Sequence, residues 1–237
     1  MSEHFRVGAG ARGEEAQRTG NHEVPMLLAS RKGSDTCRSC AVRRADTVGV
    51  CPARVPDPLA RYARECASML LAGREAALAR AESAARTVEA AAKALRRPRP
   101  EMLVASAYLH DIGTSEQAVR SGLPSVDGAV ELLSMGWPDP VISLVAHQLQ
   151  SRMIARYLDA GPQLALITRI QGWPADILDY AILTTGADGA IRPVEEGLAA
   201  VEREQAAEPR IPDRIARERL GRLARAGSRV RDALTRP

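Results

Sequence analysis

The chain has 237 residues, of which 45% are hydrophobic and 26% are charged, as expected for one globular domain with or without a tail. Its formal net charge is +4, but the central third is acidic and both flanking parts are basic, which argues against nucleic acid as the partner. With 4 cysteines and no apolar run long enough for a bilayer, the composition excludes a disulfide scaffold and a membrane-spanning helix. We expect a cytoplasmic protein that does not bind membranes.

Residues 1–56 differ from the rest of the chain because they combine scattered glycine and arginine with no sustained apolar period. We expect a disordered or loosely structured extension. Cys37, Cys40 and Cys51 resemble three ligands of a zinc knuckle or a redox pair, but Cys66, the nearest fourth cysteine, lies in a predicted helix. We therefore interpret the cysteines as a fortuitous cluster.

Residues 57–237 are punctuated as a series of helices. Asp57 and Pro58 form an N-cap and first helical position, and Gly73 closes the helix that they begin. Later breaks fall at proline residues, and no segment alternates β-branched residues with period two. The sequence predicts an all-α domain with further helices over 74–96, 101–111, 126–135, 138–149, 152–160, 174–185, 193–206 and 212–234.

The last predicted helix has an apolar stripe and an arginine-rich opposite face. The stripe consists of Ile211, Ile215, Leu220, Leu223, Val230 and Leu234. A helix of this kind either packs on the domain with a solvated basic face or serves as a basic arm for a partner. We favour packing, since no aromatic residues interleave with the arginines.

The strongest chemical signal is His110 followed directly by Asp111, at the end of an apolar helix and just before Gly113. An imidazole nitrogen beside a carboxylate offers two ligands for a divalent cation, provided that other helices add more. The alternative is a structural pair, in which the histidine is hydrogen-bonded in the core and the aspartate caps the next turn.

The surrounding segments resemble the HD-domain superfamily of metal-dependent phosphohydrolases, in particular a small single-domain bacterial branch. The resemblance covers about residues 70–205 and rests on AYLHDIG (107–113), SVDGAVELLSMGWP (125–138), VISLVAHQLQS (141–151) and LDYAILTTGADGAIRPVEEGLAAV (178–201). It implies an HD-like helical bundle around a divalent metal ion (Mn, Mg or Fe), which activates water to attack a phosphate ester.

On this resemblance, His110 and Asp111 match the central metal-binding pair, and Asp111 is the candidate catalytic residue. His147 matches a histidine found at that point in related sequences, and it completes the candidate metal ligands. Asp127 matches the acidic residue of the DGA turn and is the candidate ligand-binding residue.

Two positions depart from the family pattern. Thr87 aligns best with the first metal-binding histidine, and Ile182 aligns with the last metal-binding aspartate. Asp179 lies one turn before Ile182 and is a candidate substitute ligand. A histidine is also missing at Pro124. Loss of an imidazole and a carboxylate weakens a site for Mg²⁺ or Mn²⁺.

The sequence therefore predicts a phosphohydrolase-like protein with an eroded metal site, weak or inactive in hydrolysis, that binds a phosphorylated small molecule or a nucleotide. Two alternatives remain open. One is an active metal-dependent phosphohydrolase that uses replacement ligands. The other is a non-catalytic interaction module that docks a partner through the N-terminal extension or the C-terminal helix.

Overall fold

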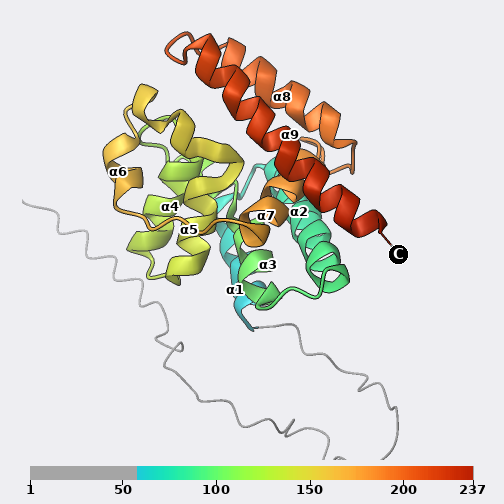
Figure 1. Cartoon of the computed structure of the whole chain (residues 1–237). Coiled ribbons are helices and arrows are strands. Elements are labelled where there is room, and N and C mark those ends of the chain that lie inside the picture. The colour runs from blue at the N-terminus through green and yellow to red at the C-terminus, as the bar shows by residue number, and fades with distance from the viewer. Residues whose placement is uncertain (1–57, 237) are drawn as a thin grey trace, which may run out of the picture. The chain divides into compact units, whose positions relative to one another are not determined.

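The computed structural model describes residues 58–236, and the predicted all-α class is confirmed for this part of the chain (Figure 1). Its only sheet-like pairing there is an isolated bridge between Thr185 and Ile191. The predicted N-terminal extension and Cys37, Cys40 and Cys51 lie outside the described residues. The α-helices are α1 (Pro58–Leu70), α2 (Glu75–Ala94), α3 (Pro100–Leu109), α4 (Pro124–Ser134), α5 (Asp139–His147), α6 (Gly161–Ala165), α7 (Trp173–Leu183), α8 (Val194–Ala206) and α9 (Asp213–Thr235). Short 3₁₀ helices are η1 (Ile112–Thr114), η2 (Gln148–Met153) and η3 (Ala155–Tyr157).

Proline and glycine set many of the helix ends, as the sequence predicts. Pro58, Pro100 and Pro124 stand at the first positions of α1, α3 and α4, where the missing N–H leaves no hydrogen bond unmade. After α1 and α4 the chain turns through Gly73 and Gly136, both with positive φ. These residues explain why most predicted boundaries agree with the structure to within a few positions.

The helix predicted over 152–160 is wrong. The chain instead forms η2 and η3 there, and α6 begins only at Gly161. Leu149 (φ 48°) and Gln150 (φ 55°) adopt left-handed conformations, and so does Asp159 (φ 57°). Residues in the left-handed conformation end a right-handed helix. The side chains of Leu149, Gln150 and Asp159 give no sequence signal that predicts this conformation.

The core is organised around α3, whose residues are buried on almost every side. Leu103, Val104 and Leu109 are all buried, and α3 packs against α1, α2, α5 and α7. Alanines of α2 such as Ala84, Ala85 and Ala91 are also buried, so short side chains allow α2 and α3 to pack closely. The C-terminal end of α3 therefore lies at the centre of the domain.

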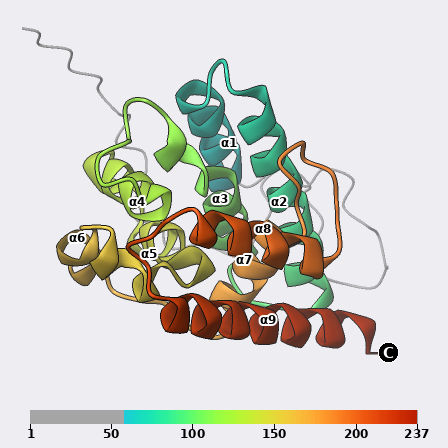
Figure 2. The same ribbon diagram turned by 90° about the horizontal axis from the view of Figure 1, so that it is seen from above.

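The C-terminal helices α8 and α9 lie side by side, and α9 also packs along α7 (Figures 1 and 2). The predicted apolar stripe of α9 is confirmed at Ile215, Leu223 and Val230, which are buried. Within residues 58–236, no helix has the length and apolar character needed to cross a membrane. Cys66 of α1 is a core residue, and burial raises the pKa of its thiol to about 11.

Candidate functional site

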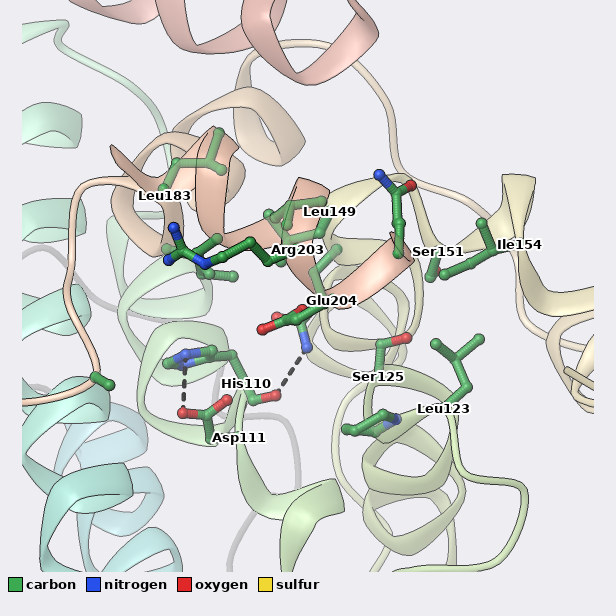
Figure 3. A pocket seen from close by; sticks show the side chains of 18 of the residues that line it. His110, Asp111, Leu123, Ser125, Leu149, Ser151, Ile154, Leu183, Arg203 and Glu204 are labelled. Carbon is green, nitrogen blue, oxygen red and sulfur yellow. Dashed lines mark hydrogen bonds and ion pairs between the residues drawn. The ribbon is translucent and has the colours of Figure 1, made fainter. Parts of the chain in front are cut away.

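A cavity of about 790 Å³ lies where the end of α3 meets α2, α4, η2, α7, α8 and α9 (Figure 3). His110 and Asp111 line it directly after α3, and Gly113 lets the next turn approach α4. A Cβ atom on Gly113 would overlap the carbonyl oxygen of Pro124, so only glycine fits there. The sequence motif thus places an imidazole and a carboxylate in the wall of a cavity.

His110 is 2% exposed, and its hydrogen bonds define its tautomer. Nδ1 lies 2.7 Å from the carbonyl oxygen of Ala107, so Nδ1 carries the proton and donates it. Burial lowers the pKa of His110, and this effect prevails over the opposing charge of Asp111. The ring is therefore neutral near pH 7. Its Nε2 atom has no hydrogen-bond partner and lies 3.3 Å from Asp111 Oδ2.

Asp111 is held by Arg80, which reaches it from α2. Arg80 Nε donates to Oδ2 at 2.5 Å, and Arg80 Nη2 donates to Oδ1, so both carboxylate oxygens are engaged. Burial acts to raise the pKa of Asp111, but the His110 ring and the Arg80 guanidinium lower it, and the lowering prevails. The result is an ionised carboxylate neutralised by a guanidinium in a bidentate pair.

The position on α2 that faces the His–Asp pair is therefore Arg80, not Thr87. Thr87 lies seven residues further along α2, and its hydroxyl donates to the carbonyl oxygen of Ser83 at 3.1 Å. It lines a separate, smaller hollow. Ile182 does line the main cavity, where its side chain offers no ligand atom.

These residues do not fit a divalent metal ion. In the part of the chain that the structure describes, no three side chains of His, Cys, Asp or Glu come together in a way that could hold one. Of the predicted ligands, only His110 and Asp111 meet, and Arg80 places a positive charge on the carboxylate. A bound guanidinium repels a second cation from the same oxygens.

His147 has a structural role at the end of α5. Its Nε2 lies 3.0 Å from the carbonyl oxygen of Ile167 and donates to it, which ties α5 to the segment after α6. Burial lowers the pKa of His147. The residue does not line the cavity.

Asp127 caps the loop before α4. Its Oδ2 atom accepts the backbone N–H groups of Arg120 and Gly122, both at 3.1 Å, and its Oδ1 atom accepts the backbone N–H and the hydroxyl of Ser121. The side chain is buried and does not line the cavity. Asp127, the predicted ligand-binding residue, therefore holds the backbone of the loop before α4 in place.

Asp179 supports the left-handed segment rather than the His–Asp pair. Its Oδ1 atom accepts the backbone N–H of Leu149 at 2.6 Å, and its Oδ2 atom lies 3.4 Å from Gln150 Nε2. The predicted substitute ligand is therefore occupied by the left-handed segment of η2.

Asp179 gives the protein a specific pH dependence. Burial raises its pKa from 3.8 to about 7, although hydrogen bonds from Leu149 and Gln150 oppose the shift. The folded protein holds this proton more tightly than the unfolded chain does, so the stabilisation is complete below pH 4 and is lost as pH rises through 7.

Asp179→Asn removes this pH-dependent contribution to stability. Between pH 5 and 8, the free energy of unfolding of the variant relative to wild type should rise by about 2 kcal/mol in urea titrations. A difference that does not change with pH would contradict the assignment.

Several cavity residues escaped prediction from the sequence, among them Arg80 and Arg219. Arg219 lies four residues after Ile215 and four before Leu223, so it belongs to the buried stripe of α9. That spacing was a usable signal, because a cation within an apolar stripe is unusual. Arg80 had no comparable signal, since α2 contains two arginines, Arg80 and Arg86, and only the fold determines which one faces Asp111.

Among the described residues that line the cavity, four have a buried polar atom without a hydrogen-bond partner. They are His110 (Nε2), Ser125 (Oγ), Gln148 (Oε1) and, on α8, Gln205 (Nε2). Gln148 is held in place by its amide nitrogen, which donates to the carbonyl oxygen of His110 at 2.7 Å. Of the three atoms outside α8, two are acceptors and one is a hydroxyl, so this wall suits a group that carries hydrogen-bond donors.

Comparison of the chain with models of known protein families, with characterised proteins and with solved structures gives no match. The cavity and its residues are therefore the basis for inferring a function.

Proposed function

We propose that residues 58–236 form an HD-like domain that binds a phosphorylated small molecule or a nucleotide without a metal ion, and hydrolyses it weakly or not at all. The observation that carries the proposal is the bidentate pair between Arg80 and Asp111. In an HD-type phosphohydrolase the equivalent carboxylate would bind the metal ion, and here a guanidinium of this chain takes its oxygens.

The cavity supports ligand binding. Its volume of about 790 Å³ lies in the range of small-molecule sites, and its lining combines aliphatic side chains with about as many polar and charged ones. Four arginines line it, and arginine is a common ligand for phosphate oxygens.

The alternative of an active metal-dependent enzyme receives less support. It requires Asp179 or Asp127 to replace the missing ligands, and both carboxylates are engaged by backbone N–H groups elsewhere. His110 Nε2 could accept a proton from water, but the site offers no group that combines with it to activate a nucleophile at a phosphorus atom.

The alternative of an interaction module also receives no specific support. The exposed arginines of α9 that the structure engages pair with acidic residues of the same domain: Arg222 with Glu218, Arg229 with Asp176, and Arg231 with Glu195. These pairs reduce the positive charge that α9 could offer to a partner, although Arg214, Arg217 and Arg225 of α9 are exposed.

Isothermal titration calorimetry with AMP, ADP and ribose 5-phosphate tests the proposal, each in EDTA and in Mn²⁺. We expect saturable binding of at least one of them with the same affinity in EDTA and in Mn²⁺, and no release of phosphate. Hydrolysis that needs Mn²⁺ and is lost in Asp111→Asn would overturn the proposal, and so would the absence of binding.

A further inference from the structure

We infer that the anionic group of the ligand docks on Arg219 and Arg203, at the α8–α9 side of the cavity, and that the ligand is a phosphorylated polyol. This inference rests on the proposed function and places the phosphate away from the His–Asp pair. Glu204, the neighbour of Arg203, lines the same cavity and carries the negative charge that would compete with this anion.

Arg219 is a buried cation without a counter-charge in contact. Its side chain is 7% exposed, and it donates from Nε to the carbonyl oxygen of Leu149 at 2.8 Å and from Nη1 to Gln205 Oε1 at 3.1 Å. Among the described residues, no carboxylate forms an ion pair with it. Burial lowers its pKa to about 10, so it stays protonated at neutral pH. Burying a charge without a partner is costly, and an anionic ligand would remove that cost.

Arg203 adds a second cation from α8. Its guanidinium lines the same cavity and makes no hydrogen bond or ion pair within residues 58–236. Figure 3 shows Arg203 and Glu204 projecting from α8 beside His110. Because Arg203 is exposed, it is free to close on a ligand that reaches Arg219.

The remaining charges of the cavity are almost all paired. Arg80 is bound to Asp111, Arg192 lies 3.4 Å from Glu196, and Glu208 is bound to Arg210. The unpaired charges that line the cavity are those of Arg203, Arg219 and Glu204, an excess of one positive charge. The α8–α9 side is therefore the side that favours an anion.

Glu204 is the residue that an incoming anion would displace. Its negative charge acts to raise the pKa of Arg80 and opposes the lowering of the pKa of Arg219 by burial, so its carboxylate lies within electrostatic range of both. It forms no ion pair or hydrogen bond within the described part of the chain, and its side chain is exposed. Because no contact within the described residues fixes the Glu204 carboxylate, a ligand with more negative charge can displace it.

The opposite wall indicates the class of ligand. The unpaired atoms of His110, Ser125 and Gln148 suit hydroxyl groups of a ligand. Among the described residues, no Phe, Tyr or Trp lines this cavity, and the one ring in its lining is the His110 imidazole, so a nucleobase would find little aromatic surface to stack on. A phosphorylated polyol satisfies both walls, with its phosphate at the arginines and its hydroxyls at the acceptors.

Calorimetric titration of the full chain with ribose 5-phosphate tests the inference through exposed residues, so that folding is preserved. Arg203→Gln should weaken binding by about 5- to 20-fold, the value of one charge-assisted hydrogen bond. Glu204→Gln should strengthen it by about 3- to 10-fold because the competing carboxylate is gone. The matched controls Arg217→Gln and Glu202→Gln change the same charges at exposed positions outside the cavity and should leave the affinity unchanged.

Equal affinities in wild type, Arg203→Gln and Glu204→Gln would overturn the inference, as would the absence of ribose 5-phosphate binding. Tighter binding of AMP than of ribose 5-phosphate would overturn the polyol assignment. If AMP binds without metal and is insensitive to both variants, the proposed function stands and this inference fails. If Mn²⁺-dependent hydrolysis appears while both variants act as expected, the proposed function fails and the phosphate position stands.

Discussion

Replacing Arg80 by leucine should lower the free energy of unfolding by about 3–5 kcal/mol, the usual cost of removing one partner from a buried ion pair. Asp111 would remain in the core beside His110 with no cation on its oxygens. The loss should be larger at pH 8 than at pH 5, because without Arg80 the buried carboxyl group can take up a proton at low pH. Urea denaturation followed by circular dichroism measures both effects.

Two controls separate charge from geometry at this pair. Arg80→Lys keeps the charge but loses the bidentate contact, so we expect an intermediate loss. The double variant Arg80→Leu/Asp111→Leu removes both charges together and should be considerably more stable than either single variant. Additive losses in the double variant would show that the pair does not act as a unit.

Asp127→Ala should lower the free energy of unfolding by about 3 kcal/mol, because several hydrogen bonds to one ionised group are lost together. The backbone N–H groups of Arg120, Ser121 and Gly122 all point at this carboxylate. The carboxylate also lies in the first turn of α4, where a negative charge is favourable. Thermal and urea denaturation measure the loss.

Asp127→Asn is the matched control for this loop. It can keep the acceptor for Ser121 but presents an amide to the N–H groups of Arg120 and Gly122, so we expect roughly half of the loss. Ligand affinity of the folded fraction should stay unchanged in both variants. A selective loss of affinity with normal stability would restore Asp127 as a ligand-binding residue.

The helices could be predicted because residues at their own ends determine where each helix begins and stops. Pro58 and Pro124 begin α1 and α4, and Gly73 and Gly136 follow these two helices, in the sequence as in the structure. The segment over 152–160 could not be predicted in this way. The left-handed backbone at Leu149 and Gln150 is supported by Asp179, about thirty residues away in the sequence, and no local pattern contains that contact.

In the site, too, the features set by local sequence could be predicted, and the contacts between distant segments could not. The place of His110 and Asp111 at the end of a buried helix followed from the sequence, and Ile182 lines the cavity as its alignment suggested. The partner of Asp111 did not follow, because the aligned position pointed to Thr87, two helical turns from Arg80. Whether a carboxylate meets a metal ion or a guanidinium depends on which residue of another helix faces it.

On the proposed function, Arg80 takes the place of a metal ion at Asp111. Equilibrium dialysis of the wild-type protein against Mn²⁺, followed by elemental analysis, tests it most directly. We predict much less than one ion per chain, at the level found for Asp111→Asn. One tightly bound Mn²⁺ per chain that is lost in Asp111→Asn would contradict the account.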